Sequence, residues 1–226
     1  SWRGENTQVA EDYMTFERVE FNAKTLAVTV RASRELLQDT VNVEQELPNI
    51  LAAVMGQELD RAVYLGSGSG NEPLGIDNMA GVLNVAHDAV IDGYQPFITA
   101  RQKLMTENAE QVGPFIGNPS VEGAVGSLLD SNGQPLQVPP VLNRPNPFSM
   151  LVTNKLPNNL GTGSNESVIY GGDMRQLAIG VRLGVDIQVL RERYSDFNQI
   201  GFLVVMRADV QPIRANHLVR ITGVQT

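Results

Sequence analysis

The residues of this chain that could perform chemistry are few. Cysteine is absent, and histidine occurs twice, at His87 and His217. The absence of cysteine excludes a disulfide scaffold, a thiol nucleophile and every cysteine-ligated metal site. A Ser-His-Asp triad would need one of the two histidines, and no serine lies in a G-x-S-x-G nucleophile elbow. We therefore interpret both histidines as ordinary surface or hydrogen-bonded residues, and we predict no catalytic residue, no metal ligand and no cofactor.

A glycine-serine run, Gly66-Ser-Gly-Ser-Gly70, has the composition of a phosphate-binding loop. Dinucleotide-binding loops read G-x-G-x-x-G after a strand, and P-loops end in G-K-[ST]. This run reads G-x-G-x-G, follows a predicted helix and lacks the lysine. We interpret it as a flexible connection between two lobes. A small enzyme with its site at this loop stays as the alternative from another functional class.

The charged residues indicate no catalytic pair either. Among 226 residues, 17 are basic and 25 are acidic, which gives a formal net charge of −8. This balance argues against a protein whose main task is to neutralise phosphate. Glu58 and Asp60 straddle two faces of a predicted helix, while Asp186, Glu192 and Asp196 are scattered, so we expect exposed carboxylates. Hydrophobic residues make up 42% of the chain, enough for a core, but no apolar run reaches a membrane-spanning length.

The strongest helical pattern begins after Asn42, which forms a capping box with Gln45. Apolar residues then recur at spacings of three and four up to Val63, which predicts a helix of about 22 residues kinked by Pro48 and ended by Gly66. This stripe includes Ile50, Leu51, Val54 and Met55. Shorter helices are predicted at 34–37, at 96–112, at 119–129 and after Asp173.

Alternation of apolar and polar residues predicts a half-buried strand, whose inner face carries Val181, Leu183, Val185, Ile187 and Val189. Residues 200–206 form a continuous apolar run that fits a buried strand or a buried helix. Shorter strands are predicted at 82–85, 115–117, 148–153, 167–170 and 218–222. Because strands and helices mix without a regular βαβ repeat, the pattern favours the α+β class.

Residues 17–30 alternate in two opposite phases. This predicts two strands, or one strand with a bulge near 22–24, in a long hairpin arm. Since an isolated hairpin is only marginally stable, such an arm needs a neighbour to lie on.

Several short motifs follow one another in a fixed order along the chain. They are Val28–Asp39 with its S-x-x-L-L-x-D pattern, Glu58–Gly66 at the end of the long helix, Pro73–Ile76, Phe115–Pro119, Leu151–Pro157, Ser167–Asp173, Val185–Arg193 continued to Phe197, and Arg207–Pro212. Together they resemble the major capsid proteins of tailed bacteriophages with the HK97 fold. The resemblance covers almost the whole chain.

The resemblance implies an HK97-like α+β fold in three parts. A peripheral domain, with a long spine helix on an extended sheet, would comprise 24–82 and 181–214. An axial domain would comprise 83–180 and 215–226, and residues 1–23 would belong to an extended loop that reaches over a neighbouring subunit. Because the chain begins with Ser1, we also expect the family's N-terminal arm and any scaffolding segment to precede it.

The implied function is that of a structural subunit of an icosahedral phage capsid, which self-assembles into pentamers and hexamers around the DNA genome. The implied partners are further copies of the chain, scaffolding and portal proteins, and packaged double-stranded DNA without sequence specificity, but no membrane. The implied location is the virion, after assembly in the bacterial host cytoplasm. An encapsulin-like compartment shell is the alternative within the fold. As contacts between subunits we select Trp2, Glu5, Phe16 and Arg18.

Some members of the resembled family cross-link themselves covalently. They use a lysine in the extended loop, an asparagine on a neighbour and a glutamate as base. Residues 1–23 contain no lysine, and the matching asparagine and glutamate positions fall at about Ile200 and Arg207. We therefore predict no isopeptide cross-linking.

Overall fold

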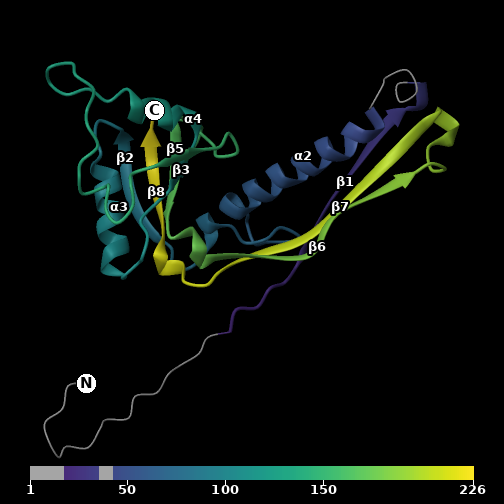
Figure 1. Cartoon of the computed structure of the whole chain (residues 1–226), viewed down its shortest axis with the longest axis horizontal. Coiled ribbons are helices and arrows are strands. Elements are labelled where there is room, and N and C mark those ends of the chain that lie inside the picture. The colour runs from purple at the N-terminus through teal and green to yellow at the C-terminus, as the bar shows by residue number, and fades with distance from the viewer. Residues whose placement is uncertain (1–17, 36–42) are drawn as a thin grey trace, which may run out of the picture.

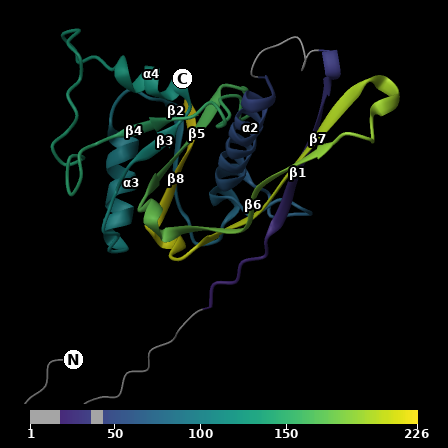
Figure 2. The ribbon, with the colours of Figure 1, turned by 45° about the vertical axis from the view of Figure 1, so that its right-hand side comes forward.

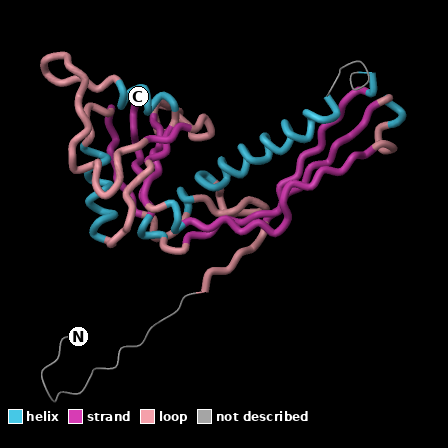
Figure 3. Tube along the Cα trace, viewed as in Figure 1, coloured by secondary structure: helices cyan, strands magenta, loops and turns pink. Residues whose placement is uncertain are grey.

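Two lobes extend from a shared base in the computed structural model, which describes residues 18–35 and 43–226 (Figure 1). The long lobe consists of one long helix above a narrow sheet. The compact lobe consists of a wider sheet with two shorter helices (Figure 3). The mixture of helices with two separate sheets is the predicted α+β arrangement.

The long lobe is built on helix α2 (Val43–Leu65), which confirms the predicted helix. Gly66 ends it as expected, and its amide donates to the carbonyl oxygen of Ala62 over 2.9 Å. Beneath the helix lies an antiparallel sheet in the order β1-β7-β6. Its strands are β1 (Lys24–Ser33), β7 (Gln199–Pro212) and β6 (Leu177–Leu190).

Helix α2 packs on one face of this sheet, which we call the inner face. Leu51 and Met55 of the helix lie in one buried cluster with Phe202, Val204 and Met206 of β7. Every second residue of β1 contributes to the same cluster, as alternation in a strand requires. The apolar run at 200–206 is therefore a central strand, and the helical interpretation is excluded.

Strand β6 exists as predicted, but its apolar residues are not buried as predicted. Val181 and Val189 pair with the buried residues Ala208 and Phe202, so they lie on the inner face, yet they remain 55% and 48% exposed. Only Ile187 of the predicted set packs against the core beneath α2. The reason is the strand order: β6 is an edge strand, and one helix covers mainly the other two strands.

The predicted apolar stripe of α2 is likewise buried only in part. Leu51 and Met55 are 5% and 2% exposed, whereas Ile50 and Val54 are 57% and 50% exposed. The helix thus carries an apolar surface wider than the sheet beneath it covers.

The predicted hairpin arm is wrong for the residues that the structure describes. Residues 18–23 are extended but belong to no strand, and β1 pairs with β7 far along the chain. Two contacts hold this segment. The amide of Asn22 donates to the buried carboxylate of Asp209 over 2.7 Å, and Phe21 lies against Gly180. The segment then leaves the base of the long lobe (Figure 1).

The compact lobe contains a five-stranded sheet in the order β2-β8-β5-β3-β4. Strand β8 lies in its interior, parallel to β2 and antiparallel to β5. Helices α3 (Gln95–Thr106) and α4 (Pro119–Gly126) belong to this lobe (Figure 2). The strands are β2 (Leu83–Val90), β3 (Phe115–Gly117), β4 (Met150–Val152), β5 (Glu166–Gly172) and β8 (Leu218–Gln225).

Both helices of this lobe are shorter than predicted. Helix α3 ends at Thr106 because Asn108 adopts a left-handed conformation with φ +58°, and the amide of Ala109 donates back to Leu104 over 3.0 Å. Helix α4 ends at Gly126, whereas its predicted start is confirmed. The Asn118 side chain accepts a hydrogen bond from the amide of Ser120 over 3.0 Å, the geometry of an N-cap.

A buried cluster joins the two lobes. Val63 at the end of α2 packs with Tyr170 of β5, Val210 of β7 and Leu218 of β8. The ring of Tyr64 stacks on that of Tyr170 with 5.4 Å between centroids. The lobes are thus connected by core packing as well as by the chain.

Candidate site at the glycine loop and candidate contact residues

The glycine loop, which we define as residues 66–75, is an ordered turn that closes on itself. The amide of Gly75 donates to Gly66 over 2.9 Å, and the amide of Gly68 donates to Pro73 over 3.1 Å. A Cβ atom on Gly75 would lie 2.3 Å from the backbone nitrogen of Gly66. The two ends of the loop therefore approach each other so closely that no side chain fits at Gly75. The interpretation as a flexible connection is therefore wrong.

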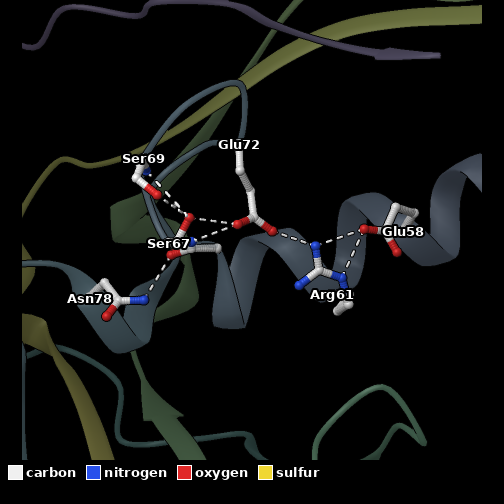
Figure 4. Close-up of polar contacts among 7 residues, drawn as sticks. Glu58, Arg61, Ser67, Ser69, Glu72 and Asn78 are labelled. Carbon is white, nitrogen blue, oxygen red and sulfur yellow. Dashed lines mark hydrogen bonds and ion pairs between the residues drawn. The ribbon is translucent and has the colours of Figure 1, made fainter.

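A network of partly exposed polar contacts fixes this loop to α2 (Figure 4). The carboxylate of Glu72 accepts hydrogen bonds from the amide and the hydroxyl of Ser67, over 3.0 and 2.7 Å. It also pairs with Arg61 of α2, whose guanidinium reaches Glu58 over 2.7 Å. These donors, Arg61 first, lower the pKa of Glu72 to about 2, and the two carboxylates raise the pKa of Arg61.

This geometry does not favour a phosphate site in the loop. The amide of Ser67 and the amide of Gly68 already donate to the chain's own oxygens. The loop also follows the C-terminus of α2, where the helix dipole is negative and disfavours an anion. The glycines have a packing role here, as Gly66 and Gly75 show. Nothing in the loop's contacts supports the alternative of an enzyme with its site at Gly66–Gly70.

The two histidines lie far apart in the fold. His87 of β2 is exposed, and its Nε2 lies 3.2 Å from the carbonyl oxygen of Val90. His217 lies in the short turn that connects β7 to β8. It is buried, and its Nδ1 has no hydrogen-bond partner among the described residues. We expected both histidines to be surface or hydrogen-bonded residues. His87 is both, whereas His217 is buried. Among the described residues, no three His, Asp or Glu side chains are grouped for a metal.

The sequence did not indicate that Asp173 and Asp209 would be buried, and both carboxylates have structural partners. Asp173 caps a short turn and accepts hydrogen bonds from the Nε and Nη2 atoms of Arg175, over 2.8 and 2.9 Å. These bonds lower the pKa of Asp173. Asp209 accepts the amide of Asn22. The capping position of Asp173 was a signal in the sequence that its side chain would accept backbone hydrogen bonds. No neighbouring residue in the sequence indicates that Asp209 is buried.

Of the selected contact residues, only Arg18 lies within the described part of the chain. It is exposed and pairs with Glu20 over 3.1 Å. Trp2, Glu5 and Phe16 lie outside the described residues.

The two positions matched to cross-linking residues have ordinary structural roles. Ile200 packs in part against the core beneath α2. The Arg207 guanidinium donates to the carbonyl oxygen of Ala23 over 3.5 Å. Neither side chain carries the amide carbon or the base that the reaction needs, so no isopeptide bond can form through these two positions.

Comparison with known proteins decides the family. Residues 1–223 match the profile of the phage capsid family. This chain belongs to the phage capsid family. A curated member, the major capsid protein of Klebsiella oxytoca phage phiKO2, is 30% identical over 191 residues. That match covers 80% of the chain but 44% of the relative, so the chain spans less than half of that capsid protein.

Solved structures of phage capsid proteins share the fold. The capsid of an empty GTA particle superposes with a TM-score of 0.71 at 20% identity, over 99% of this chain and 80% of that one. The chain from Mycobacterium phage Ogopogo gives 0.70 at 15% identity, over 98% and 82%. The capsid of the myovirus XM1 gives 0.66 at 17% identity, over 90% and 74%. The HK97-like α+β fold is thereby confirmed.

Within the described residues, no helix is long and apolar enough to cross a membrane.

Proposed function

We propose that this chain is a structural subunit of an icosahedral phage capsid, which self-assembles into pentamers and hexamers around the DNA genome. The observation that carries the proposal is the match to the phage capsid family over residues 1–223. The ordered motifs in the sequence resemble the same family.

The proposal assigns a role to each part of the chain. Residues 24–82 and 181–214 form the peripheral domain, and 83–180 with 215–226 form the axial domain around the five- and six-fold axes. Residues 1–23 form part of an extended loop over a neighbour. The separation of the strands into two sheets supports this division, and pairing of residues 177–180 with 209–212 favours a peripheral sheet that begins at Leu177.

The exposed apolar surface of the long lobe supports a role in assembly. Val181 and Val189 of β6, together with Ile50 and Val54 of α2, are at least 48% exposed. A monomer rarely leaves several large apolar side chains uncovered on neighbouring elements, since burying each one is favourable. Contacts between subunits would cover them in a shell.

The proposed partners are further copies, scaffolding and portal proteins, and double-stranded DNA held without sequence specificity. A net charge of −8 agrees with a wall that encloses DNA rather than a protein that binds it tightly. The proposed location is the virion, after assembly in the bacterial host cytoplasm.

Electron microscopy and sedimentation of the product of the complete gene test this function. We expect uniform, hollow icosahedral particles. A stable monomer from the complete gene would contradict the proposal. Particles that retain a protein cargo through a peptide signal and never contain DNA would identify an encapsulin-like compartment instead.

A further inference from the structure

A cavity of about 350 Å³ lies between the second half of α2, the glycine loop, and the facing parts of β1 and β7. Pockets that hold small molecules measure from about 300 to about 1,000 Å³. Ala62 of α2 and Ala208 of β7 line the cavity, and their short side chains leave space between the helix and the sheet. The cavity can therefore enclose a small apolar group. The rest of its apolar lining comes from Leu26, Leu59, Pro73 and Met206.

The wall that the glycine loop contributes is fixed before any ligand binds. Glu72 of the loop accepts a hydrogen bond from the Ser67 hydroxyl over 2.7 Å and pairs with Arg61 of α2 (Figure 4). Arg61 also pairs with Glu58 over 2.7 Å. A ligand that enters a preformed site avoids the cost of ordering the chain around it. This favours the binding of even a small ligand.

The charged groups that line the cavity favour a single negative charge on the ligand. Arg61 is shared by Glu58 and Glu72, so two carboxylates face one guanidinium, and this trio disfavours a dianion. Lys24 lines the same cavity and donates to the carbonyl oxygen of Gly70 over 3.2 Å, but it has no carboxylate partner among the described residues. An ammonium group has three donors, so Lys24 can also bind one carboxylate.

We propose that this cavity binds a small organic monocarboxylate whose body is one or two aromatic rings. The rings lie between Ala62 and Ala208, where the burial of apolar surface is favourable, and the carboxylate pairs with Lys24 at the rim. For a ligand of about a dozen heavy atoms we expect a Kd on the order of 1 mM. The site belongs to the single chain, so binding does not depend on the proposed function.

NMR titration of the full, unassembled chain with 1-naphthoate tests the inference. We expect saturable shifts of backbone amides at the cavity, including those of Leu59, Ala62 and Asn71. The neutral analogue 1-naphthalenemethanol should shift the same amides but bind about three-fold more weakly, because it lacks the charge that pairs with Lys24. Acetate, which has the charge but no ring, should cause no saturable shift over the same range of concentration.

Two pairs of variants locate the ligand. Lys24→Gln should bind 1-naphthoate about three-fold more weakly, and no better than the neutral analogue, whereas Lys155→Gln in the compact lobe should bind as the parent does. Ala62→Leu should lower the affinity about ten-fold, because the larger side chain takes the space of the rings. Ala53→Leu places the same change at an exposed position of α2 and should leave binding unchanged.

Several results would overturn the inference. They are the absence of saturable shifts, equal binding by both members of each pair, and shifts centred on the exposed residues Ile50 and Val54 of α2. Cavity amides that shift with protein concentration alone would show that a second copy of the chain occupies the cavity, which would overturn it as well. If Ala62→Leu does not fold, the lysine pair still decides. None of these results alters the test of the proposed function, which is the formation of particles.

Discussion

The carboxylate of Glu72 is the centre of the contacts that hold the glycine loop on α2. Arg61 and, to a lesser extent, Ser67 donate to its charged form and lower its pKa from 4.5 to about 2. A carboxyl whose pKa is lower in the folded protein stabilises the fold fully above its unfolded pKa. This stabilisation is lost as the pH falls from about 4.5 through about 2.

The substitution Glu72→Gln should therefore destabilise the chain by about 2 kcal/mol at pH 7, since it removes charge-assisted hydrogen bonds. Near pH 2 the difference from the parent should be much smaller, because the parent carboxyl is then about half protonated in the folded chain and almost fully protonated in the unfolded chain. Urea unfolding at several pH values measures this. Glu192→Gln, at an exposed carboxylate without a side-chain partner among the described residues, is the control. An equal loss at pH 2 and pH 7 would contradict the role of the charge.

Residue types alone could not predict which carboxylates would be buried. Asp173 was placed correctly as a cap, and its side chain accepts the amide of Arg175 over 3.2 Å. Asp209 is only 3% exposed, and its carboxylate accepts a hydrogen bond from the backbone amide of Asn22, which is 187 positions away in the sequence. A partner so distant in sequence leaves no local pattern.

At the scale of elements, two glycines have opposite roles. A Cβ on Gly75 would lie 2.3 Å from the backbone of Gly66, while Gly56 in α2 has no heavy atom within 4 Å of the added Cβ. Gly75→Ala should cost about 2–3 kcal/mol through overpacking. Gly56→Ala should stabilise the chain by about 0.5–1 kcal/mol, because alanine favours a helix. Thermal unfolding of both variants should show shifts of opposite sign, and two shifts of the same sign would contradict the packing argument.

The faces of α2 can be distinguished in the same way. Met55 is buried against β7, so Met55→Ala should cost about 2–5 kcal/mol by leaving a cavity. Val54→Ala, at the neighbouring exposed position, should change the stability by less than about 0.5 kcal/mol. Chemical denaturation of the unassembled chain measures both. Similar losses for the two variants would show that Val54 is covered in solution.

Periodicity predicted the elements better than it predicted their burial. The helix 43–65 and the strand around 181–189 were found because their spacing is regular. The exposure of Val181 and Val189 could not be predicted, since it depends on β6 being an edge strand. Helix α3 was predicted too long because Ala109 and Val112 are buried beyond its end, which Asn108 sets. The glycine loop was misinterpreted because its closing partner, Glu72, lies outside the glycine run.

At the scale of the whole molecule, the lobes share a buried middle. Val63, Tyr170, Val210 and Leu218 come from four elements of both lobes. The long lobe therefore projects from a packed base, while its tip and edges stay uncovered. This shape exposes surface for neighbours without weakening the connection between the lobes.

Assembled shells should separate into single chains, without covalent multimers, in denaturing gels. The reason is chemical: residues 1–23 contain no lysine, and Ile200 supplies no amide. Particles are first verified by microscopy and then boiled in detergent. A covalent ladder from the unmodified chain would contradict this prediction.

The interior position of β8 in the compact lobe has a consequence for the timing of synthesis. Residues 218–225 separate β2 from β5, so neither the parallel pairing of β8 with β2 nor its antiparallel pairing with β5 can form before they leave the ribosome. Contacts that join residues so distant in sequence also form slowly. Translation that stops early would leave β2 and β5 without the strand between them. The subunit thus completes its fold only after elongation has passed residue 225, which keeps prematurely terminated chains from acquiring the complete five-stranded sheet.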